Sequence, residues 1–596
     1  MPTRSAPTLD LSANALRVLQ ARYLLRDAER RVIETPAQLF ERVATAIAQA
    51  EASFGGSPSE WAERFHALLV ARDFVPNSPT LMNAGTALGQ LSACFVLPIE
   101  DTMESIFEAV KQMALVQRTG GGTGFSFSRL RPRGDIVAST GGEASGPVSF
   151  MKIFDCATEN IKQGGKRRGA NMGALAVEHP DILEFIAAKL DGKTLANFNT
   201  SVSVSDAFMQ AAARGETYEL INPRTGRPAG RMDAARVFDA IVEAAWRSGD
   251  PGLLFRDAIN RANPTPALGA IEVTNPCGEV PLLPYESCTL GSINLAHLVR
   301  EESGRAAFDW ERLDALVADA VRFLDDVIEV NRYPLPQIER ATRATRKIGL
   351  GVMGFADTLI RLGIGYDSDE AERFAERLMR AIAARAARAS LALGRARGVF
   401  PAWPSSVYAA RARPLRNATR TAIAPTGTIG IIAGASASIE PLFALAYRRT
   451  GVLGGETLVE INPLLAQHLQ RRGLDARRVL DAVRERGRLG EVPGVPEELK
   501  RLFVTALEIP PERHLAIQAA FQRHVDNAVS KTINLPHDAT PLDVARIYRR
   551  AWELGVKGVT VYRYGSKATQ VLELAVDEAP HQFDHASRCD PEECRI

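Results

Sequence analysis

Short apolar runs alternate with amphipathic helical segments from Asn77 to Tyr564, and this pattern limits the possible folds more than any other feature. Helical patterns at 102–118 and 232–249 separate some of these runs. Strands that alternate with helices favour an α/β fold with parallel pairing, and the length of the pattern favours a barrel-like central domain. The strand-like runs are SACFVLPI (92–99), GFSFSRL (124–130), ANFNTSVSV (196–204) and GVTVYRY (558–564).

Residues 11–73 have a different texture, with apolar residues at i, i+3 and i+4 between polar breaks. This spacing is typical of amphipathic helices. After Tyr564 the pattern decays into a polar tail that ends in DHASRCDPEECRI. We therefore predict a helical N-terminal domain at 1–75, a catalytic α/β domain at 76–565 and a flexible tail at 566–596. Residues 368–397 and 455–515, which are rich in Arg, Ala and Glu, are predicted to form solvated helices.

Charge and hydropathy exclude several classes of partner. Lys and Arg total 72 against 70 Asp and Glu, so the formal net charge is only +2. This balance gives no electrostatic reason to expect a nucleic acid or a membrane surface as the main partner. The N-terminus has no signal-peptide pattern, and we expect a cytoplasmic protein.

Six cysteines in 596 residues do not make a disulfide scaffold, so thiol pairing in a reducing compartment should be catalytic or transient. Cys277 stands in TNPCGE, a loop beside Asn275 and Glu279. Structural zinc is disfavoured because the chain has no CxxC pair, and a Cys–His hydrolase lacks an obvious base. Cys94 is expected in a strand, and Cys156 is expected to be a small core hydrophobe.

The last two cysteines, Cys589 and Cys594, lie in the polar tail with only four residues between them. Two thiols on a mobile segment suit thiol–disulfide exchange with a disulfide buried elsewhere in the protein. Incidental cysteines and metal ligation are the alternatives for this pair.

Three glycine-rich segments, 118–128, 139–150 and 162–173, could bring backbone amides close to a ligand, although glycine-rich turns are common in α/β proteins. APTGTIGII (424–432) is a turn with two hydroxyls that suits a phosphate. It lacks the lysine of a Walker loop, which excludes a P-loop NTPase.

Together these segments resemble the ribonucleotide reductase family, specifically its adenosylcobalamin-dependent (class II) ribonucleoside-diphosphate reductases. The resemblance covers roughly residues 10–570. It is carried by NSPTLMNAG (77–85), LSACF (91–95), NPCGE (275–279), SCTLGSIN (287–294), RKIGLGVMGFAD (346–357), PTGTIG (425–430) and KTINLP (531–536).

The resemblance implies a ten-stranded α/β barrel around a central finger loop, which is the NPCGE segment. It implies that Cys277 becomes a thiyl radical, that Glu279 is the general base, and that Asn275 hydrogen-bonds the substrate. Cys94 and Cys288 would supply two electrons and become a disulfide. Cys589 and Cys594 would reduce that disulfide and pass the oxidation to thioredoxin or a glutaredoxin-like donor.

The resemblance also implies binding residues for the substrate and for an allosteric effector, which would be a deoxynucleotide or ATP at the interface of a homodimer. The substrate-binding residues implied are Ser78, Ala93, Gly122, Pro276, Gly278, Pro425, Thr426, Gly427, Thr428 and Ile429. The effector-binding residues implied are Asp101, Arg131, Lys162, Gln163 and Arg167. No metal-ligating side chains are expected.

The cofactor follows from the resemblance alone. Large subunits that need a separate metal-radical subunit carry two adjacent tyrosines, whereas Tyr562 and Tyr564 are separated here by Arg563. About 75 residues before the barrel also leave little room for an added regulatory domain. Both points favour adenosylcobalamin. Two alternatives stay open: a large subunit with a separate radical partner, and a non-catalytic nucleotide-binding regulator.

Overall fold

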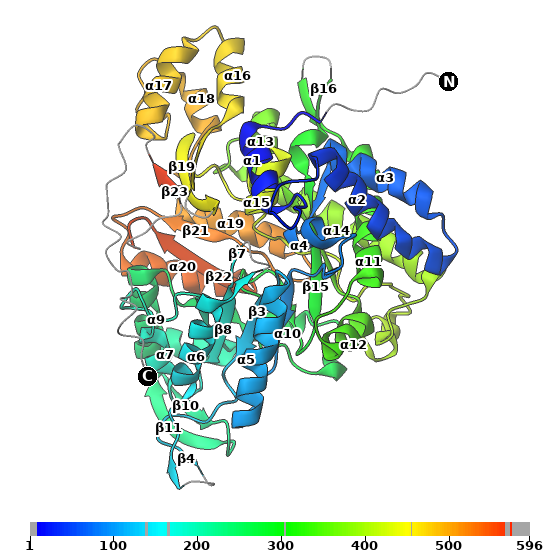
Figure 1. Cartoon of the computed structure of the whole chain (residues 1–596). Helices are drawn as coiled ribbons and strands as arrows, with labels where there is room; N and C mark the ends of the chain where they lie inside the picture. Colours follow the sequence, from blue (N-terminus) through cyan, green and yellow to red (C-terminus); the bar gives the residue numbers. More distant parts are fainter. Residues whose placement is uncertain are drawn as a thin grey trace.

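The computed structural model describes residues 9–137, 141–163, 167–302, 305–453, 456–566 and 572–574. The tail cysteines Cys589 and Cys594 lie outside these residues. Within them, no helix is long and apolar enough to cross a membrane. Figure 1 places the N-terminal helices beside α11 and α14, while α16, α17 and α18 project at the upper left of the view. These elements are α11 (Trp310–Val330), α14 (Asp369–Arg397), α16 (Pro463–Arg471), α17 (Ala476–Arg486) and α18 (Glu497–Leu502).

The N-terminal part is helical, and its helices begin where local sequence signals predict. Thr35 and Gln38 form a capping box with Pro36 at the first helical position, which satisfies amide groups at the helix start. The apolar faces of these helices join one large core with α11, α14 and the strand β18 (Ile348–Met353). The helices are α1 (Ala13–Arg22), α2 (Pro36–Ala48), the 3-10 helix η1 (Gln49–Phe54) and α3 (Pro58–Ala71).

A ten-stranded sheet forms the centre of the molecule. Five strands run parallel in the order β2, β3, β8, β9, β12; β2 then pairs antiparallel with β15, and β12 with β22. The further pairs β15–β18 and β22–β21 are parallel, and β1 pairs antiparallel with β15. The strands are β1 (Phe74–Pro76), β2 (Cys94–Val96), β3 (Gly122–Ser126), β8 (Asn171–Ala176), β9 (Phe198–Val204), β12 (Gly252–Phe255), β15 (Ser287–Asn294), β21 (Thr532–Leu535) and β22 (Gly558–Arg563).

Two isolated bridges close this sheet. Leu350 of β18 pairs with Thr421, and Ile423 pairs with Val529 just before β21. Residues 421–423 therefore form a short strand segment between β18 and β21, and the sheet closes into a barrel. The barrel consists of two groups of parallel strands, and the two groups run antiparallel to each other. The expected ten-stranded α/β barrel with a helical N-terminal region is confirmed.

Strand β9 illustrates why these sequences form barrel staves. Its side chains alternate, so that Phe198, Val202 and Val204 belong to the core between the barrel and the outer helices. Asn199, Ser201 and Ser203 take the opposite face, toward the lumen.

The outer layer contains α5 (Met103–Arg118), α6 (Pro147–Asn160), α7 (Ile182–Ala187), α8 (Asp206–Arg214), α9 (Ala234–Ser248), α10 (Arg256–Arg261), α12 (Pro336–Thr345), α13 (Phe355–Leu362), α19 (Pro511–Gln522) and α20 (Pro541–Glu553).

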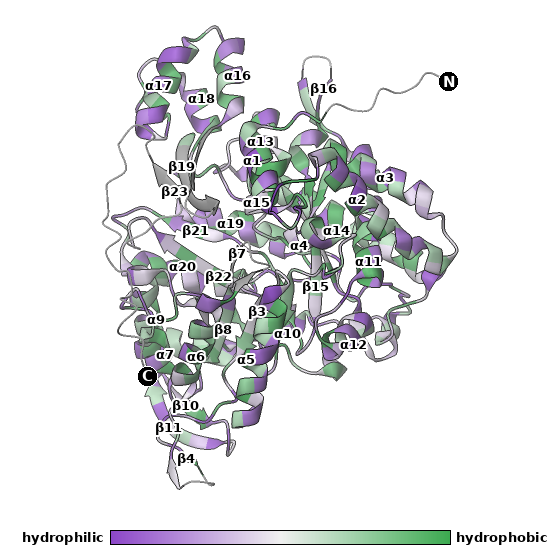
Figure 2. Cartoon of the chain, in the orientation of Figure 1, coloured by the Kyte–Doolittle hydropathy of each residue, from purple (hydrophilic) through white to green (hydrophobic). Residues whose placement is uncertain are grey.

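The region 455–515 departs from the sequence expectation. It begins with a strand, β20 (Glu456–Ile461), which pairs with β19 (Ala446–Leu453) before the projecting helices start. The run ETLVEI has a β-branched residue at every second position (Thr457, Val459 and Ile461), a strand signal that the arginine-rich helices after it obscured. Figure 2 shows that the projecting helix α17 is largely hydrophilic, as expected for a solvated helix.

Candidate active site

The NPCGE segment forms the tip of a finger inside the barrel. Its sides are β13 (Val273–Thr274) and β14 (Pro281–Leu282), which pair antiparallel. At the tip, the backbone N–H of Val280 donates to Asn275 Oδ1 at 3.0 Å, and Gly278 has a φ of +83°. Asn275 closes the turn through its side chain and Gly278 allows the left-handed backbone, so this sequence is suited to a tight tip.

Glycines of the barrel wall make room for the finger. A Cβ atom added at Gly124 of β3 would lie 1.9 Å from the carbonyl oxygen of Thr274, and one at Gly122 would lie 3.0 Å from Pro276 Cγ. No larger residue fits at Gly124 without displacing the finger backbone. Part of the glycine-rich stretch 118–128 therefore accommodates the finger itself, a task that sequence reasoning assigned to ligand approach.

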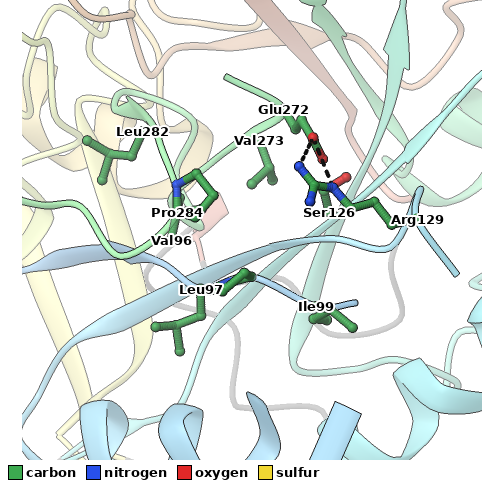
Figure 3. A pocket seen from close by; sticks show the side chains of 10 residues that line it. Val96, Leu97, Ile99, Ser126, Arg129, Glu272, Val273, Leu282 and Pro284 are labelled. Carbon is green, nitrogen blue, oxygen red and sulfur yellow. Dashed lines mark hydrogen bonds and ion pairs between the residues drawn. The ribbon is translucent and has the colours of Figure 1, made fainter. Parts of the chain in front are cut away.

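The base of the finger is tied to the same wall by charge. Arg129 Nη2 lies 2.7 Å from Glu272 Oε1, just before β13, and Arg129 Nη1 lies 2.5 Å from Glu100 Oε1. Figure 3 shows Arg129 and Glu272 at one side of a small cavity whose other walls are mostly apolar. The cavity has a volume of about 20 Å³, which is far too small for a nucleotide.

Four predicted catalytic side chains meet at the finger. Cys94 of β2 and Cys288 of β15 are directly opposite each other in the antiparallel register. Asn275 Nδ2 donates to Cys94 Sγ at 3.2 Å, and Cys94 Sγ lies 3.9 Å from Glu279 Oε1. Opposed residues on antiparallel strands have Cβ atoms about 4.5–5.5 Å apart, so Cys94 and Cys288 need only a small shift to form a disulfide.

The side chains at the finger differ in how far they are buried, and burial sets the protonation of the thiols. Cys94, Cys288, Asn275 and Glu279 are buried, whereas Cys277 at the fingertip is exposed. Burial raises the pKa of the Cys94 thiol well above its usual value, and the nearby Glu279 carboxylate raises it further. Burial also raises the pKa of Cys288. Both buried cysteines are therefore neutral thiols at pH 7 and can donate hydrogen as well as electrons.

Glu279 has the properties of a general base. Burial raises its pKa to about 7, although hydrogen bonds from Asn275 and Cys94 oppose the shift. Its Oε2 atom is buried and has no hydrogen-bond partner among the described residues. A carboxylate with a pKa near neutrality and one unengaged oxygen can accept a proton from a ligand in the barrel.

The PTGT turn follows the strand segment 421–423 and starts α15 (Gly427–Ala433). Thr426 has a φ of +50° and Ser438 a φ of +49°, and the backbone N–H of Ser438 donates to Thr426 Oγ1 at 2.7 Å. Left-handed backbone at a non-glycine residue costs about 1–3 kcal/mol and is concentrated at functional sites. The predicted residues Gly427 and Thr428 are accessible at this turn, while Ile429 is buried in the core beneath it.

Ser78, the first residue of α4 (Ser78–Asn83), has a partner that sequence reasoning missed. Its hydroxyl lies 2.7 Å from the hydroxyl of Tyr23, the C-cap of α1, and α1 packs against α15. The N-terminal helices therefore link Ser78 to the PTGT turn. Ala93 lies next to Cys94, where its carbonyl oxygen accepts the N–H of Gly122 at 2.9 Å.

Asp101 and Arg131, the predicted effector residues, contact each other. Arg131 Nε lies 2.8 Å from Asp101 Oδ2, and the Arg131 backbone N–H donates to Asp101 Oδ1 at 3.0 Å. The remaining three predicted residues belong to a short hairpin, β6 (Lys162–Gln163) with β7 (Arg167–Arg168), whose backbone alone is described.

The surroundings of Cys156 and Arg563 bear on two points of the sequence analysis. Cys156 is not a core residue, because it lies on the exposed side of α6. Its neighbours Met151 and Phe154 face the core instead, so the apolar face of this helix does not include Cys156. Arg563, between Tyr562 and Tyr564, stacks its guanidinium 4.3 Å from the ring centre of Trp246 and donates to the carbonyl oxygen of His537.

Comparison with known proteins identifies the family. Residues 9–89 match the family model of the ribonucleotide reductase all-alpha domain, and residues 92–414 and 409–562 match that of the ribonucleotide reductase barrel domain. The chain therefore belongs to the ribonucleotide reductase family.

Individual relatives narrow the position within the family. A protein of Mycobacterium tuberculosis named vitamin B12-dependent ribonucleoside-diphosphate reductase is 54% identical over 95% of this chain and 80% of its own length. One of the same name from Thermoplasma acidophilum is 49% identical over 96% of this chain and 81% of its own. The solved class Id ribonucleotide reductase alpha subunit of Actinobacillus ureae has the same fold. That structure matches with a TM-score of 0.76 and 23% identity, covering 94% of this chain and 99% of its own.

Proposed function

We propose that this chain is a vitamin B12-dependent ribonucleotide reductase that converts ribonucleoside diphosphates to 2′-deoxyribonucleotides by a thiyl-radical mechanism. The observation that carries the mechanism is the constellation at the finger. An exposed Cys277 shares a tip with buried Glu279, whose Oε1 lies 3.9 Å from Cys94 Sγ and whose Oε2 has no hydrogen-bond partner among the described residues. Cys94 in turn is opposed by Cys288. The B12-dependent relatives support the cofactor and the diphosphate substrate.

Each side chain has one task in this reaction. The Cys277 thiyl abstracts the 3′-hydrogen, and Glu279 accepts the proton of the 3′-hydroxyl. Both are returned to the product at the end of the reaction, which regenerates the thiyl radical on Cys277. The 2′-hydroxyl leaves as water as Cys94 and Cys288 give up two hydrogen atoms and become a disulfide. Asn275, whose side chain donates to Cys94 Sγ, keeps that thiol beside the general base. Burial of Glu279, Cys94 and Cys288 keeps these groups away from bulk water.

The residues at the fingertip fit an external radical source. Cys277 is exposed while its neighbours Asn275, Pro276 and Glu279 are buried, so the thiol is the accessible group of the tip. When bound, adenosylcobalamin supplies the radical equivalent that removes hydrogen from this thiol. A large subunit with a separate radical partner is the less favoured alternative, because Arg563 interrupts the tyrosine pair. A non-catalytic regulator would not need the complete set of cysteines.

The first experiment tests the cofactor. We expect the purified chain with adenosylcobalamin, a small dithiol and a ribonucleoside diphosphate to form deoxynucleotide without any other protein. Omission of adenosylcobalamin should leave no product above the uncatalysed background, and ribonucleoside triphosphates should react more slowly. Product analysis by chromatography makes the measurement. Product that appears only after a second protein is added would favour the separate radical subunit.

The tail cysteines are proposed as a relay to the buried pair. A disulfide between Cys94 and Cys288 would be inaccessible to an external protein, so a tail dithiol would carry electrons to it from thioredoxin or a glutaredoxin-like protein. Thioredoxin-supported reduction in the Cys589→Ser variant should stop after one turnover per site. The same variant should keep the wild-type rate with a small dithiol. Equal loss with both reductants would contradict a relay.

Two accessory proposals concern regulation and assembly. Asp101 and Arg131 would bind a deoxynucleotide or ATP effector near the start of α5.

Met103 and Phe107 on α5 and Ile153 on the adjacent α6 are large apolar residues with exposed fractions of 55%, 48% and 36%. Exposed apolar patches of this kind mark interfaces, which supports a homodimer formed through α5 and α6 (Figure 1). The thiol chemistry suits the reducing cytoplasm.

A further inference from the structure

The barrel wall carries a residue that reaches the peptide bond of Cys277. Asn199 lies on the lumen face of β9 and is paired in register with Met172 of β8. Its side chain is exposed in the lumen, unlike Ser201 and Ser203 further along the same face, which are buried. Asn199 Nδ2 donates to the carbonyl oxygen of Pro276 at 2.8 Å.

That carbonyl belongs to the peptide unit between Pro276 and Cys277. A peptide unit is planar, so fixing its oxygen also fixes the direction in which the chain enters Cys277. The proline ring restricts φ on the other side of this unit and rests against Gly122 of the wall. Beyond Cys277, the N–H of Gly278 donates to the carbonyl oxygen of Asn275 at 3.1 Å. Asn199 is the side chain that joins this tip to β9.

We propose that Asn199 is a positioning residue that holds the Cys277 sulfur at the place where it reacts. The inference rests on the proposed function of Cys277 and assigns a task to a residue outside the NPCGE motif. The base of the finger is held separately, by Gly124 against Thr274 and by Arg129 with Glu272 (Figure 3). Loss of the Asn199 contact should therefore loosen the tip without releasing the finger.

The expected effect falls on the chemical step. A displacement of about 1 Å between reacting groups can reduce a rate by about a hundredfold. Asn199→Ser, whose shorter side chain cannot reach Pro276, should lower kcat about 10- to 100-fold with little change in KM. Asn199→Gln retains the carboxamide donor and should recover part of the rate. Ser201→Ala, on the same face of β9, is the matched control and should keep the wild-type kcat.

A second readout needs neither cofactor nor turnover. Cys277 is exposed, so its alkylation by iodoacetamide can be followed by peptide mass spectrometry on the full chain. Asn199→Ser should change this alkylation rate severalfold, while Asn199→Gln stays closer to wild type and Ser201→Ala leaves it unchanged. Thermal unfolding of each variant checks that the barrel is intact.

The outcomes separate the inference from the proposed function. If the wild-type chain reduces no nucleotide but Asn199→Ser still alters Cys277 alkylation, the proposed reaction is wrong and the positioning contact stands. If Asn199→Ser leaves both kcat and alkylation unchanged, Asn199 does not position Cys277. Equal losses in Asn199→Ser and Ser201→Ala, with lowered melting temperatures in both, would reduce the contact to general packing and overturn the inference.

Discussion

Cys277→Ser should abolish deoxynucleotide formation, with a fall in kcat of at least about a thousandfold. A serine hydroxyl matches the shape of the thiol, but its O–H bond is too strong to yield the radical that the proposed mechanism needs. Nucleotide binding should persist, because the binding residues proposed for the phosphates lie on other elements. Steady-state kinetics and equilibrium binding of a ribonucleoside diphosphate make the two measurements.

Cys156→Ser is the matched control for this experiment. Cys156 is also exposed, but it lies on α6 in the outer layer, where its carbonyl oxygen accepts a hydrogen bond from the side chain of Asn160. The control variant should keep the wild-type rate. Activity that survives in Cys277→Ser, or is lost equally in both variants, would remove Cys277 from the radical role.

The second large effect is expected at Glu279. Glu279→Gln should lower kcat about 10²- to 10⁴-fold, the usual contribution of a general base. With a pKa of about 7, the wild-type carboxylate should make kcat rise between pH 6 and pH 8. This acid limb should be missing from the residual activity of the variant. A pH profile of kcat at saturating substrate provides the measurement.

The contribution of Glu279 to stability should fall as the pH rises, whereas kcat should increase. The folded-state pKa of Glu279 lies above its ordinary value of 4.5, so the stability it contributes is complete below pH 4.5 and is lost as the pH rises through 7. Glutamine does not titrate. The free energy of unfolding of Glu279→Gln relative to wild type should therefore increase by roughly 2 kcal/mol from pH 5 to pH 8.

Denaturant unfolding at both pH values tests this stability difference. Asp543→Asn is a useful comparison, because hydrogen bonds at the start of α20 lower the pKa of that carboxyl instead. Its effect on stability should have the opposite pH dependence in the acidic range. A Glu279→Gln variant with unchanged kcat and no pH-dependent gain in stability would exclude Glu279 as the raised-pKa base.

Much of the site could be anticipated because its residues are contiguous in sequence. Asn275, Cys277 and Glu279 occupy one five-residue motif, and Pro and Gly within it already predict a tight tip. The alternation of strands and helices likewise predicted the barrel. The phosphate, effector and tail assignments stay predictions, and the tail lies outside the described residues.

Other relationships were not readable from the sequence, because they depend on which distant segments become neighbours. Tyr23 lies 55 residues from Ser78, and Asn199 lies 77 residues from Pro276, yet each pair is joined by a hydrogen bond. Gly124 belongs to a segment that the sequence suggested for ligand binding, but in the structure it packs against the finger backbone at Thr274. Cys156 was misassigned because its apolar neighbours lie on one face of a helix while Cys156 lies on the other.

The sequence by itself determined the α/β class and the tight turn at NPCGE, because local periodicity and turn chemistry act over a few residues. The roles of the cysteines were predicted from the family resemblance instead. Tertiary structure decided the register that sets Cys94 opposite Cys288 and the burial that raises the pKa of Glu279 to about 7. Strand register fixes the first, and burial of the carboxyl group between the finger and the barrel wall fixes the second. Both are properties of the closed barrel, since neither a register nor a dielectric environment exists until distant strands pair.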